Sequence, residues 1–278
     1  MCLLSFHLQY PKAKYVIWFR VDQKTCLKSI INTGLQPIII EPKREGDELQ
    51  TDLEKLRSTL ETVAKEDILC IIPTTSVFAP RSPDNIIEVS KIAKEFDIPV
   101  IVNNAYGLQS SVICKQINKA IRVGRVDVLV SSTDKNILVP VGGSFVYSAN
   151  SVSTDFIRKN YPGRASMSPI LDVFITLLSM GKKKILTYLK TREECYDYLK
   201  AELEKIAGKY NQRVLQTPNN PISIAVSLRA SNETSNETSN ETSDNQAKVD
   251  KLITKFGAML YTRGVSGICL FVNLLIYI

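Results

Sequence analysis

The sequence predicts an α/β protein with a mostly parallel, doubly wound sheet, and three observations support this prediction. Short runs of β-branched and aromatic residues alternate with longer stretches in which apolar residues recur every three or four positions. The short runs are almost continuously apolar, as expected for strands that helices cover on both faces. The chain has 278 residues and 44% hydrophobic content, enough for one large domain with a smaller one attached.

The first part of the chain, residues 1–149, is predicted to be the large domain. Its strands are expected at 15–19, 37–41, 68–72, 99–102, 126–130 and 143–147. Helices are expected between them, at 22–33, 50–65, 83–96 and 107–121. Because ligands of such sheets bind at the carboxyl ends of the parallel strands, a functional site is expected along that edge.

Residues 150–278 have a different pattern and are predicted to form connecting helices and a partial, smaller α+β domain. Long helices are expected at about 168–190 and 191–210, followed by a strand at 222–228 and a last helix. A threefold Ser-Asn-Glu-Thr repeat lies between that strand and the last helix. Its low apolar content predicts a disordered loop over 229–246.

Composition narrows the class of protein. The formal net charge of +7 favours anionic partners such as RNA, although an ordinary basic surface would have the same value. The six cysteines form no close pair, which argues against a zinc site or a disulfide framework and favours buried thiols in a reducing compartment. The N-terminus lacks secretory features, and the apolar run 268–278 is shorter than the roughly 20 residues of a membrane-spanning helix. We therefore expect a cytoplasmic protein without a membrane anchor.

Lys135 is the residue that stands out chemically. It follows directly after an apolar strand, in Val128-Leu-Val-Ser-Ser-Thr-Asp-Lys135. An amine at that edge can lose its water and act as a nucleophile toward a carbonyl, although a surface lysine at a strand end is the simpler alternative. The glycines of the following turn, 139–143, would permit close approach of the backbone to a ligand. Asn103 and Asn104 end an earlier strand, where turn formation alone could explain them.

A series of segments connects these residues to a known family. In chain order they are 11–15, 22–26, 45–49, 74–81 (Thr-Thr-Ser-Val-Phe-Ala-Pro-Arg), 103–107 (Asn-Asn-Ala-Tyr-Gly), 122–125, 133–136 (Thr-Asp-Lys-Asn), 161–166 (Tyr-Pro-Gly-Arg-Ala-Ser) and 260–267. Together they resemble the O-phosphoseryl-tRNA(Sec) selenium transferases, also called selenocysteinyl-tRNA(Sec) synthases. These are pyridoxal-phosphate-dependent enzymes of fold type I.

The resemblance implies pyridoxal 5'-phosphate as the cofactor. Lys135 matches the lysine that binds it covalently and acts in catalysis, and Asn103 matches the partner of its ring nitrogen. An aspartate is usual at that position in the wider fold, so the neutral Asn103 implies a weaker electron sink. Gln23 lies in a segment that lines the cofactor.

The same resemblance implies the substrates and partners. Arg164 matches an arginine that binds the substrate phosphate, while Arg122 and Arg263 match arginines that contact tRNA. Without the resemblance, surface ion pairs would explain all three. The implied reaction is the last step of selenocysteine biosynthesis: O-phosphoseryl-tRNA(Sec) becomes selenocysteinyl-tRNA(Sec), with selenophosphate as selenium donor. The implied assembly is a homotetramer.

The chain departs from the family pattern at both ends. The family's N-terminal region, with its phosphate-binding loop, has no counterpart here, and residues 271–278 do not match, so the sequence is interpreted as truncated at both ends. One alternative function is therefore a catalytically inactive fragment or relative that retains at most tRNA or protein binding. Another is a different fold-type-I enzyme such as a cysteine desulfurase.

Overall fold

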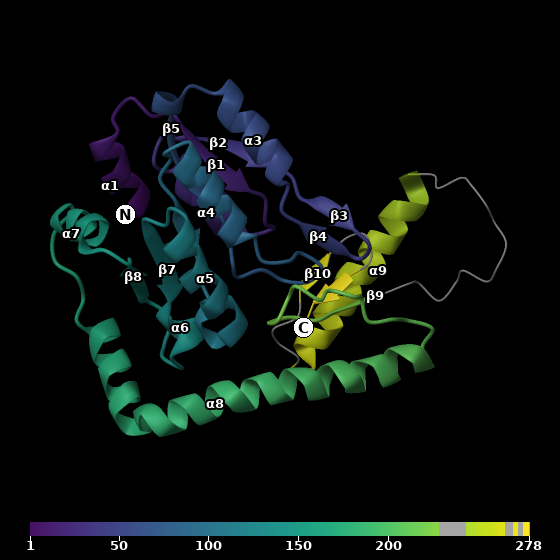
Figure 1. Cartoon of the computed structure of the whole chain (residues 1–278). Coiled ribbons are helices and arrows are strands. Elements are labelled where there is room, and N and C mark those ends of the chain that lie inside the picture. The colour runs from purple at the N-terminus through teal and green to yellow at the C-terminus, as the bar shows by residue number, and fades with distance from the viewer. Residues whose placement is uncertain (228–242, 265–268, 272–274, 278) are drawn as a thin grey trace.

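The computed structural model describes residues 1–227, 243–264, 269–271 and 275–277. Most of the loop expected at 229–246 lies outside these residues, and positions 243–246 begin helix α9 (Ser243–Thr262). The predicted α/β class with a mostly parallel sheet is confirmed (Figure 1).

The sheet is built from six strands of the first half of the chain. Strand β1 (Tyr15–Phe19) lies between β2 (Gln36–Ile40) and β5 (Ile68–Ile72), and all three are parallel. Strand β6 (Ile101–Asn103) pairs in parallel with β7 (Val128–Ser132), and β8 (Ser144–Tyr147) closes this edge in the antiparallel direction. Isolated parallel bridges, Ile71 to Val100 and Thr74 to Asn103, join β5 to β6. The strand order is therefore β2-β1-β5-β6-β7-β8.

Helices cover both faces because the strand side chains alternate between two apolar clusters. Ile17 and Phe19 of β1 pack with α3 (Leu53–Thr62), α4 (Ile86–Glu95) and α5 (Ser111–Val123). Val16 and Trp18 face the other cluster, with α1 (Cys2–Gln9), α2 (Lys24–Ile31) and α7 (Ser151–Lys159). Asp52, Asn85 and Ser110 accept hydrogen bonds from the first turns of α3, α4 and α5, which sets where these helices begin.

Several elements differ from those expected. Helices α1 and α7 and the hairpin of β3 (Lys43–Glu45) and β4 (Glu48–Gln50) were not predicted, because each is too short to show a clear period. Two helices were expected at 168–190 and 191–210; α8 (Ser168–Lys209) does consist of two helices, but they meet at a kink at Gly181 and not near residue 190. Gly181 has a φ of 63°, a conformation that favours glycine.

A second, smaller sheet lies near the C-terminus, where Figure 1 shows it beside the β3–β4 hairpin. Its strand order is β10 (Cys269–Phe271), β11 (Leu275–Tyr277) and β9 (Ala225–Ser227), all antiparallel. The segment before β9 is bonded to the first half of the chain. Arg213 pairs with Asp47, the main chain and amide of Asn219 both donate to Glu48, and the hydroxyl of Ser223 accepts from the backbone N–H of Ala79 at 2.7 Å.

The Arg213–Asp47 pair predicts an acid sensitivity. The hydrogen bonds from Arg213 hold the pKa of Asp47 at about 2, well below its usual value of about 4. A carboxyl whose pKa is lower in the folded state stabilises the fold above its unfolded pKa and loses that contribution as the pH falls through the folded one. We expect Asp47→Asn to reduce the loss of unfolding free energy between about pH 4 and pH 2. Urea titrations across this range check it, and parallel curves for both proteins would contradict it.

No helix in the described part of the chain combines the length and the apolar character needed to cross a bilayer.

Candidate functional site

Three residues expected from the sequence meet at one edge of the sheet. Gln23 precedes α2 just after β1, Asn103 is the last residue of β6, and Lys135 follows β7 in the short helix α6 (Thr133–Asn136). All three lie at the carboxyl ends of parallel strands, and all three line one cavity of about 390 Å³. This volume is in the range of small-molecule sites.

Lys135 is held at this edge by its backbone and its neighbours. Its amine Nζ lies 3.2 Å from Oδ2 of Asp134 and 3.4 Å from Oγ of Ser132. The amide of Gln109 donates to its carbonyl at 2.6 Å, and the amide of Asn136 donates to the carbonyl of Ala105 at 2.8 Å. The Lys135 side chain is 42% exposed, and its amine lies between the carboxylate of Asp134 and solvent.

Asn103 is bonded to a residue that the sequence did not single out. Its Nδ2 donates to Sγ of Cys26 at 3.1 Å, and its Oδ1 accepts from the backbone N–H of Ala105 at 3.3 Å. The same thiol lies 3.3 Å from Oε1 of Gln23, to which it donates. Burial raises the pKa of Cys26, and the hydrogen bond from Asn103 acts in the opposite direction. Cys26, Gln23 and Asn103 thus form one connected group in the cavity wall.

Asn104 has a structural role, because its side chain is fully buried next to the site. Its Oδ1 accepts from the Thr75 hydroxyl at 2.7 Å, and its Nδ2 donates to the Tyr147 hydroxyl at 2.9 Å. The Ser131 hydroxyl donates to the Asn104 carbonyl at 2.8 Å. These bonds join the segments after β5 and β6 to β7 and β8. They fix the end of β6, and with it the position of Asn103.

Gly143, in the turn after Lys135, is tightly packed within the protein. A Cβ on Gly143 would lie 2.7 Å from Oγ1 of Thr133 and 2.9 Å from Cβ of Pro169. The backbone N–H of Thr133 also donates to the Gly143 carbonyl at 3.1 Å. Gly143 therefore permits α6 to sit against the turn.

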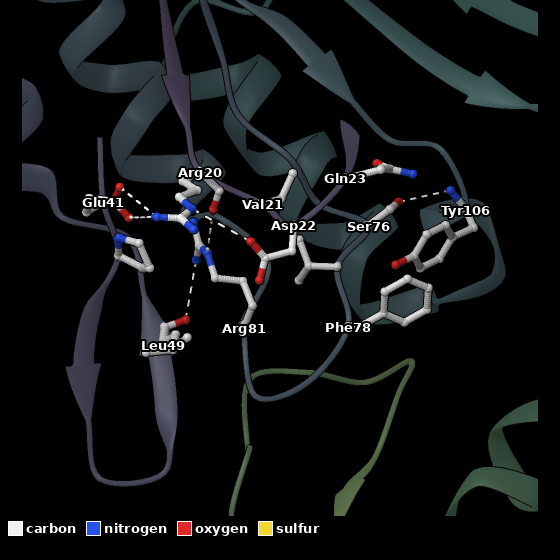
Figure 2. Close-up of a pocket in the computed structure, with 12 residues that line it drawn as sticks. Arg20, Val21, Asp22, Gln23, Glu41, Leu49, Ser76, Phe78, Arg81 and Tyr106 are labelled. Carbon is white, nitrogen blue, oxygen red and sulfur yellow. Dashed lines mark hydrogen bonds and ion pairs between the residues drawn. The ribbon is translucent and has the colours of Figure 1, made fainter. Parts of the chain in front are cut away.

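A second cavity of about 270 Å³ adjoins the first, and Gln23 lines both. Figure 2 shows Phe78 beside Tyr106, with ring centroids 5.7 Å apart. The cations here have partners: Arg20 bonds Glu41 at 3.0 Å, and Arg81 pairs with the buried carboxylate of Asp84. The second cavity thus extends the first with polar and aromatic side chains, and its charged side chains are largely paired.

The three arginines expected to bind substrate or tRNA lie apart from these cavities. Arg122 is exposed in the last turn of α5, and Arg164 is exposed between α7 and α8. Arg263 is exposed just after α9, where its Nη1 donates to the Met259 carbonyl at 3.3 Å. Within the described residues, the structure groups Gln23, Asn103 and Lys135 but does not bring these arginines to them.

The cysteines differ partly from the expected buried thiols. Cys70 is fully buried, and burial raises its pKa, whereas Cys195 on α8 is exposed. Cys2, Cys26 and Cys114 are half-buried and free. The sequence did contain a signal for Cys26, because it lies three residues after Gln23 at the start of a helix, where both side chains can share a face. Ser132 and Asp134 were similarly marked by their closeness to Lys135.

Comparisons with known proteins agree with this geometry. A family model described as "O-phosphoseryl-tRNA(Sec) selenium transferase, SepSecS" matches residues 1–273. The Dictyostelium discoideum O-phosphoseryl-tRNA(Sec) selenium transferase is 51% identical over 216 residues, covering 77% of this chain and 45% of the relative. The Caenorhabditis elegans protein of that name is 39% identical over 267 residues, covering 96% and 52%. The chain therefore spans about half the length of these relatives.

Solved structures extend the comparison to the fold. The crystal structure of archaeal O-phosphoseryl-tRNA(Sec) selenium transferase superposes with a TM-score of 0.85 at 26% identity, covering 100% of this chain and 62% of that one. The structure of Oryza sativa TDC with PLP matches at a TM-score of 0.72 and 13% identity, covering 99% and 60%, and shows the shared fold alone. With a family match over nearly its whole length and this fold, the chain belongs to the O-phosphoseryl-tRNA(Sec) selenium transferase family.

Proposed function

We propose that this chain binds pyridoxal 5'-phosphate at Lys135 and contributes to the conversion of O-phosphoseryl-tRNA(Sec) to selenocysteinyl-tRNA(Sec), with selenophosphate as selenium donor. The observation that carries the proposal is the meeting of Lys135, Asn103 and Gln23 in one cavity. Strand ends far apart in the sequence supply the amine and the amides that the family's cofactor requires. Family membership supports the choice of substrate.

The donor set fits this cofactor. A primary amine is the group that bonds an aldehyde carbon, and the Lys135 amine lies in the cavity wall beside a hydroxyl and a carboxylate. The amide of Asn103 suits a neutral ring nitrogen. When bound, the cofactor supplies an electron sink that stabilises negative charge at the substrate α-carbon while phosphate leaves the β-carbon.

The chain's own residues have separate tasks in this proposal. Lys135 Nζ holds the cofactor and, when released, carries a proton to or from the substrate α-carbon. Oδ2 of Asp134, 3.2 Å from Nζ, and the Ser132 hydroxyl at 3.4 Å accept hydrogen bonds that orient the amine. Asn103 and Gln23 orient the ring.

Substrate and tRNA contacts are assigned to the exposed arginines. Arg164 is proposed to bind the phosphate of O-phosphoserine, because a planar guanidinium can donate two hydrogen bonds to it. Arg122 and Arg263 are proposed to contact the tRNA, where exposed cations bind backbone phosphates. The exposed positions of all three leave them free to meet a large ligand.

A homo-oligomer, a tetramer as in the family, is proposed as the working assembly in the cytoplasm. The first half of α8 supports it, because a cluster of large apolar side chains is exposed there: Ile170, Leu171, Phe174, Ile175 and Leu178. Contiguous apolar patches on soluble proteins usually mark an interface.

The cofactor proposal is tested by reduction and mapping. The purified chain is mixed with pyridoxal 5'-phosphate, reduced with borohydride, digested and analysed by mass spectrometry. We expect a visible absorbance band before reduction and a single labelled peptide at Lys135. Lys135→Met should lose both, whereas Lys119→Met, an exposed lysine on α5, should retain both. Labelling spread over many lysines would defeat the proposal.

The substrate is tested on the same preparation with O-phosphoseryl-tRNA(Sec) and selenophosphate. The expected product is selenocysteinyl-tRNA(Sec), formed by the chain but not by Lys135→Met. A chain that binds the cofactor at Lys135 yet forms no product would instead support the inactive-relative alternative.

A further inference from the structure

Cys26 lies at the centre of a hydrogen-bond chain that ends on Asn103. The thiol is half-buried, faces the cavity, and lies between Oε1 of Gln23 at 3.3 Å and Nδ2 of Asn103 at 3.1 Å. A thiol has one hydrogen to donate. Because the Gln23 oxygen can only accept, the thiol hydrogen goes to Gln23. The sulfur is then left to accept from Asn103.

Two contacts set the orientation of the Asn103 amide: the one with Ala105 does so by itself, and the one with Cys26 does so once Oε1 of Gln23 takes the thiol hydrogen. The sulfur needs a donor, so the nitrogen of the amide must face Cys26. The backbone N–H of Ala105 needs an acceptor, so the oxygen must face Ala105, and the observed distance is 3.3 Å. A flipped amide would put oxygen against a sulfur that lacks a second hydrogen, and nitrogen against a backbone N–H. Both contacts would then be lost.

We propose that Cys26 is a positioning residue that fixes the Asn103 amide in one orientation, so that the second hydrogen of Nδ2 is the group offered to the cofactor's ring nitrogen. This inference rests on the proposed cofactor site. A ring nitrogen that accepts a hydrogen bond must keep its lone pair and remain unprotonated. Cys26 thereby helps to keep the ring a weaker electron sink than one paired with a carboxylate.

The chemistry of the thiol suits positioning Asn103 better than nucleophilic catalysis. Burial raises the pKa of Cys26, so at neutral pH it stays a protonated, weak nucleophile. As a thiol it can both donate and accept, which the chain from Gln23 through Cys26 to Asn103 requires. Cys26 is therefore assigned to hold Asn103 and to take no part in bond formation.

The first test needs no cofactor. In ¹H–¹⁵N spectra of the isotopically labelled full chain, the side-chain NH₂ of Asn103 is assigned, with Asn103→Asp identifying its signals. We expect Cys26→Ala to shift both signals and bring them closer together, because the bonded hydrogen becomes free. Cys26→Ser, which keeps a donor and an acceptor, should retain most of the separation. Cys195→Ala, a change at an exposed cysteine on α8, should leave the signals in place. Unchanged Asn103 signals in Cys26→Ala would overturn the inference.

The second test uses the cofactor with a ¹⁵N-labelled ring. The ring ¹⁵N shift of wild type should be that of an unprotonated nitrogen, and Cys26→Ala should move it and weaken cofactor binding about fivefold, the equivalent of one hydrogen bond. Cys26→Ser should lie close to wild type. A pure packing role would instead make serine no better than alanine and would leave the ring shift unmoved, which would also overturn the inference.

The two tests separate this inference from the proposed function. If wild type binds no pyridoxal 5'-phosphate, the proposed function fails, while the cofactor-free spectra still decide whether Cys26 holds Asn103. If wild type binds it and the ring nitrogen is protonated, the proposed function stands and the positioning inference fails.

Discussion

Asp84→Ala is expected to lower the free energy of unfolding by about 3–5 kcal/mol. The Asp84 carboxylate is 0% exposed, and its partner Arg81 is 8% exposed. Besides this ion pair, the carboxylate accepts from the backbone N–H of Thr74 at 2.7 Å and from the hydroxyl of Thr51 at 2.8 Å. Alanine would leave the buried Arg81 guanidinium without its counter-charge and the Thr74 N–H without its acceptor, and each of these losses carries its own cost.

Urea unfolding monitored by circular dichroism measures the effect. Asp197→Ala, which removes an exposed aspartate from α8, is the matched control and should change stability by less than about 0.5 kcal/mol. In the double variant Arg81→Met/Asp84→Ala, the unpaired charge is gone, so the total loss should be smaller than the sum of the two single losses. An Asp84→Ala protein as stable as the control would refute the buried pair.

Asn220→Ala is expected to cost about 2–4 kcal/mol, because one side chain satisfies four backbone groups. The Asn220 side chain is 2% exposed. Its Nδ2 donates to the carbonyls of Val77 at 3.1 Å and Arg81 at 2.9 Å. Its Oδ1 accepts from the backbone N–H groups of Ile222 and Ser223, both at 3.0 Å. At a buried position, water does not readily take over the hydrogen bonds that these four backbone groups would lose.

Asn220→Ala should also loosen the loop 77–81, which places Phe78 and Arg81 in the wall of the second cavity. Hydrogen exchange measured by mass spectrometry should therefore show faster exchange in peptides covering 77–82 than in wild type. Asn118→Ala, on the exposed face of α5, serves as the control and should leave both stability and exchange unaffected. Equal exchange in the 77–82 peptides of all three proteins would contradict this account.

The large sheet could be predicted from the sequence because its central strands β1 and β5 are buried on both faces. The apolar runs at 15–19 and 68–72 coincide with β1 and β5, since a strand covered on both sides has to be apolar throughout. The hairpin 43–50 could not be predicted in this way. Its charged residues give no periodic signal, and the buried Glu48 is hydrogen-bonded by Asn219 from a distant segment.

The candidate site was likewise predicted from the sequence only in part. Strand ends and the family resemblance identified Lys135, Asn103 and Gln23, because the carboxyl edge of a parallel sheet collects polar residues that follow apolar runs. Cys26 was missed as a partner of Asn103, since the two are far apart in the sequence and a thiol in an apolar run is usually core. The sequence left open whether the Lys135 amine is desolvated, and the structure shows it 42% exposed beside the carboxylate of Asp134.

The sequence by itself determined the fold class, the family and the strand end that holds Lys135, because hydrophobic periodicity and ordered motifs are local properties of the chain. Only the tertiary structure decided which way the Asn103 amide faces and which groups surround the Lys135 amine. The first depends on a hydrogen bond between Asn103 and Cys26, which the fold brings to 3.1 Å from each other, and the second depends on how the Asp134 and Ser132 side chains turn toward the amine.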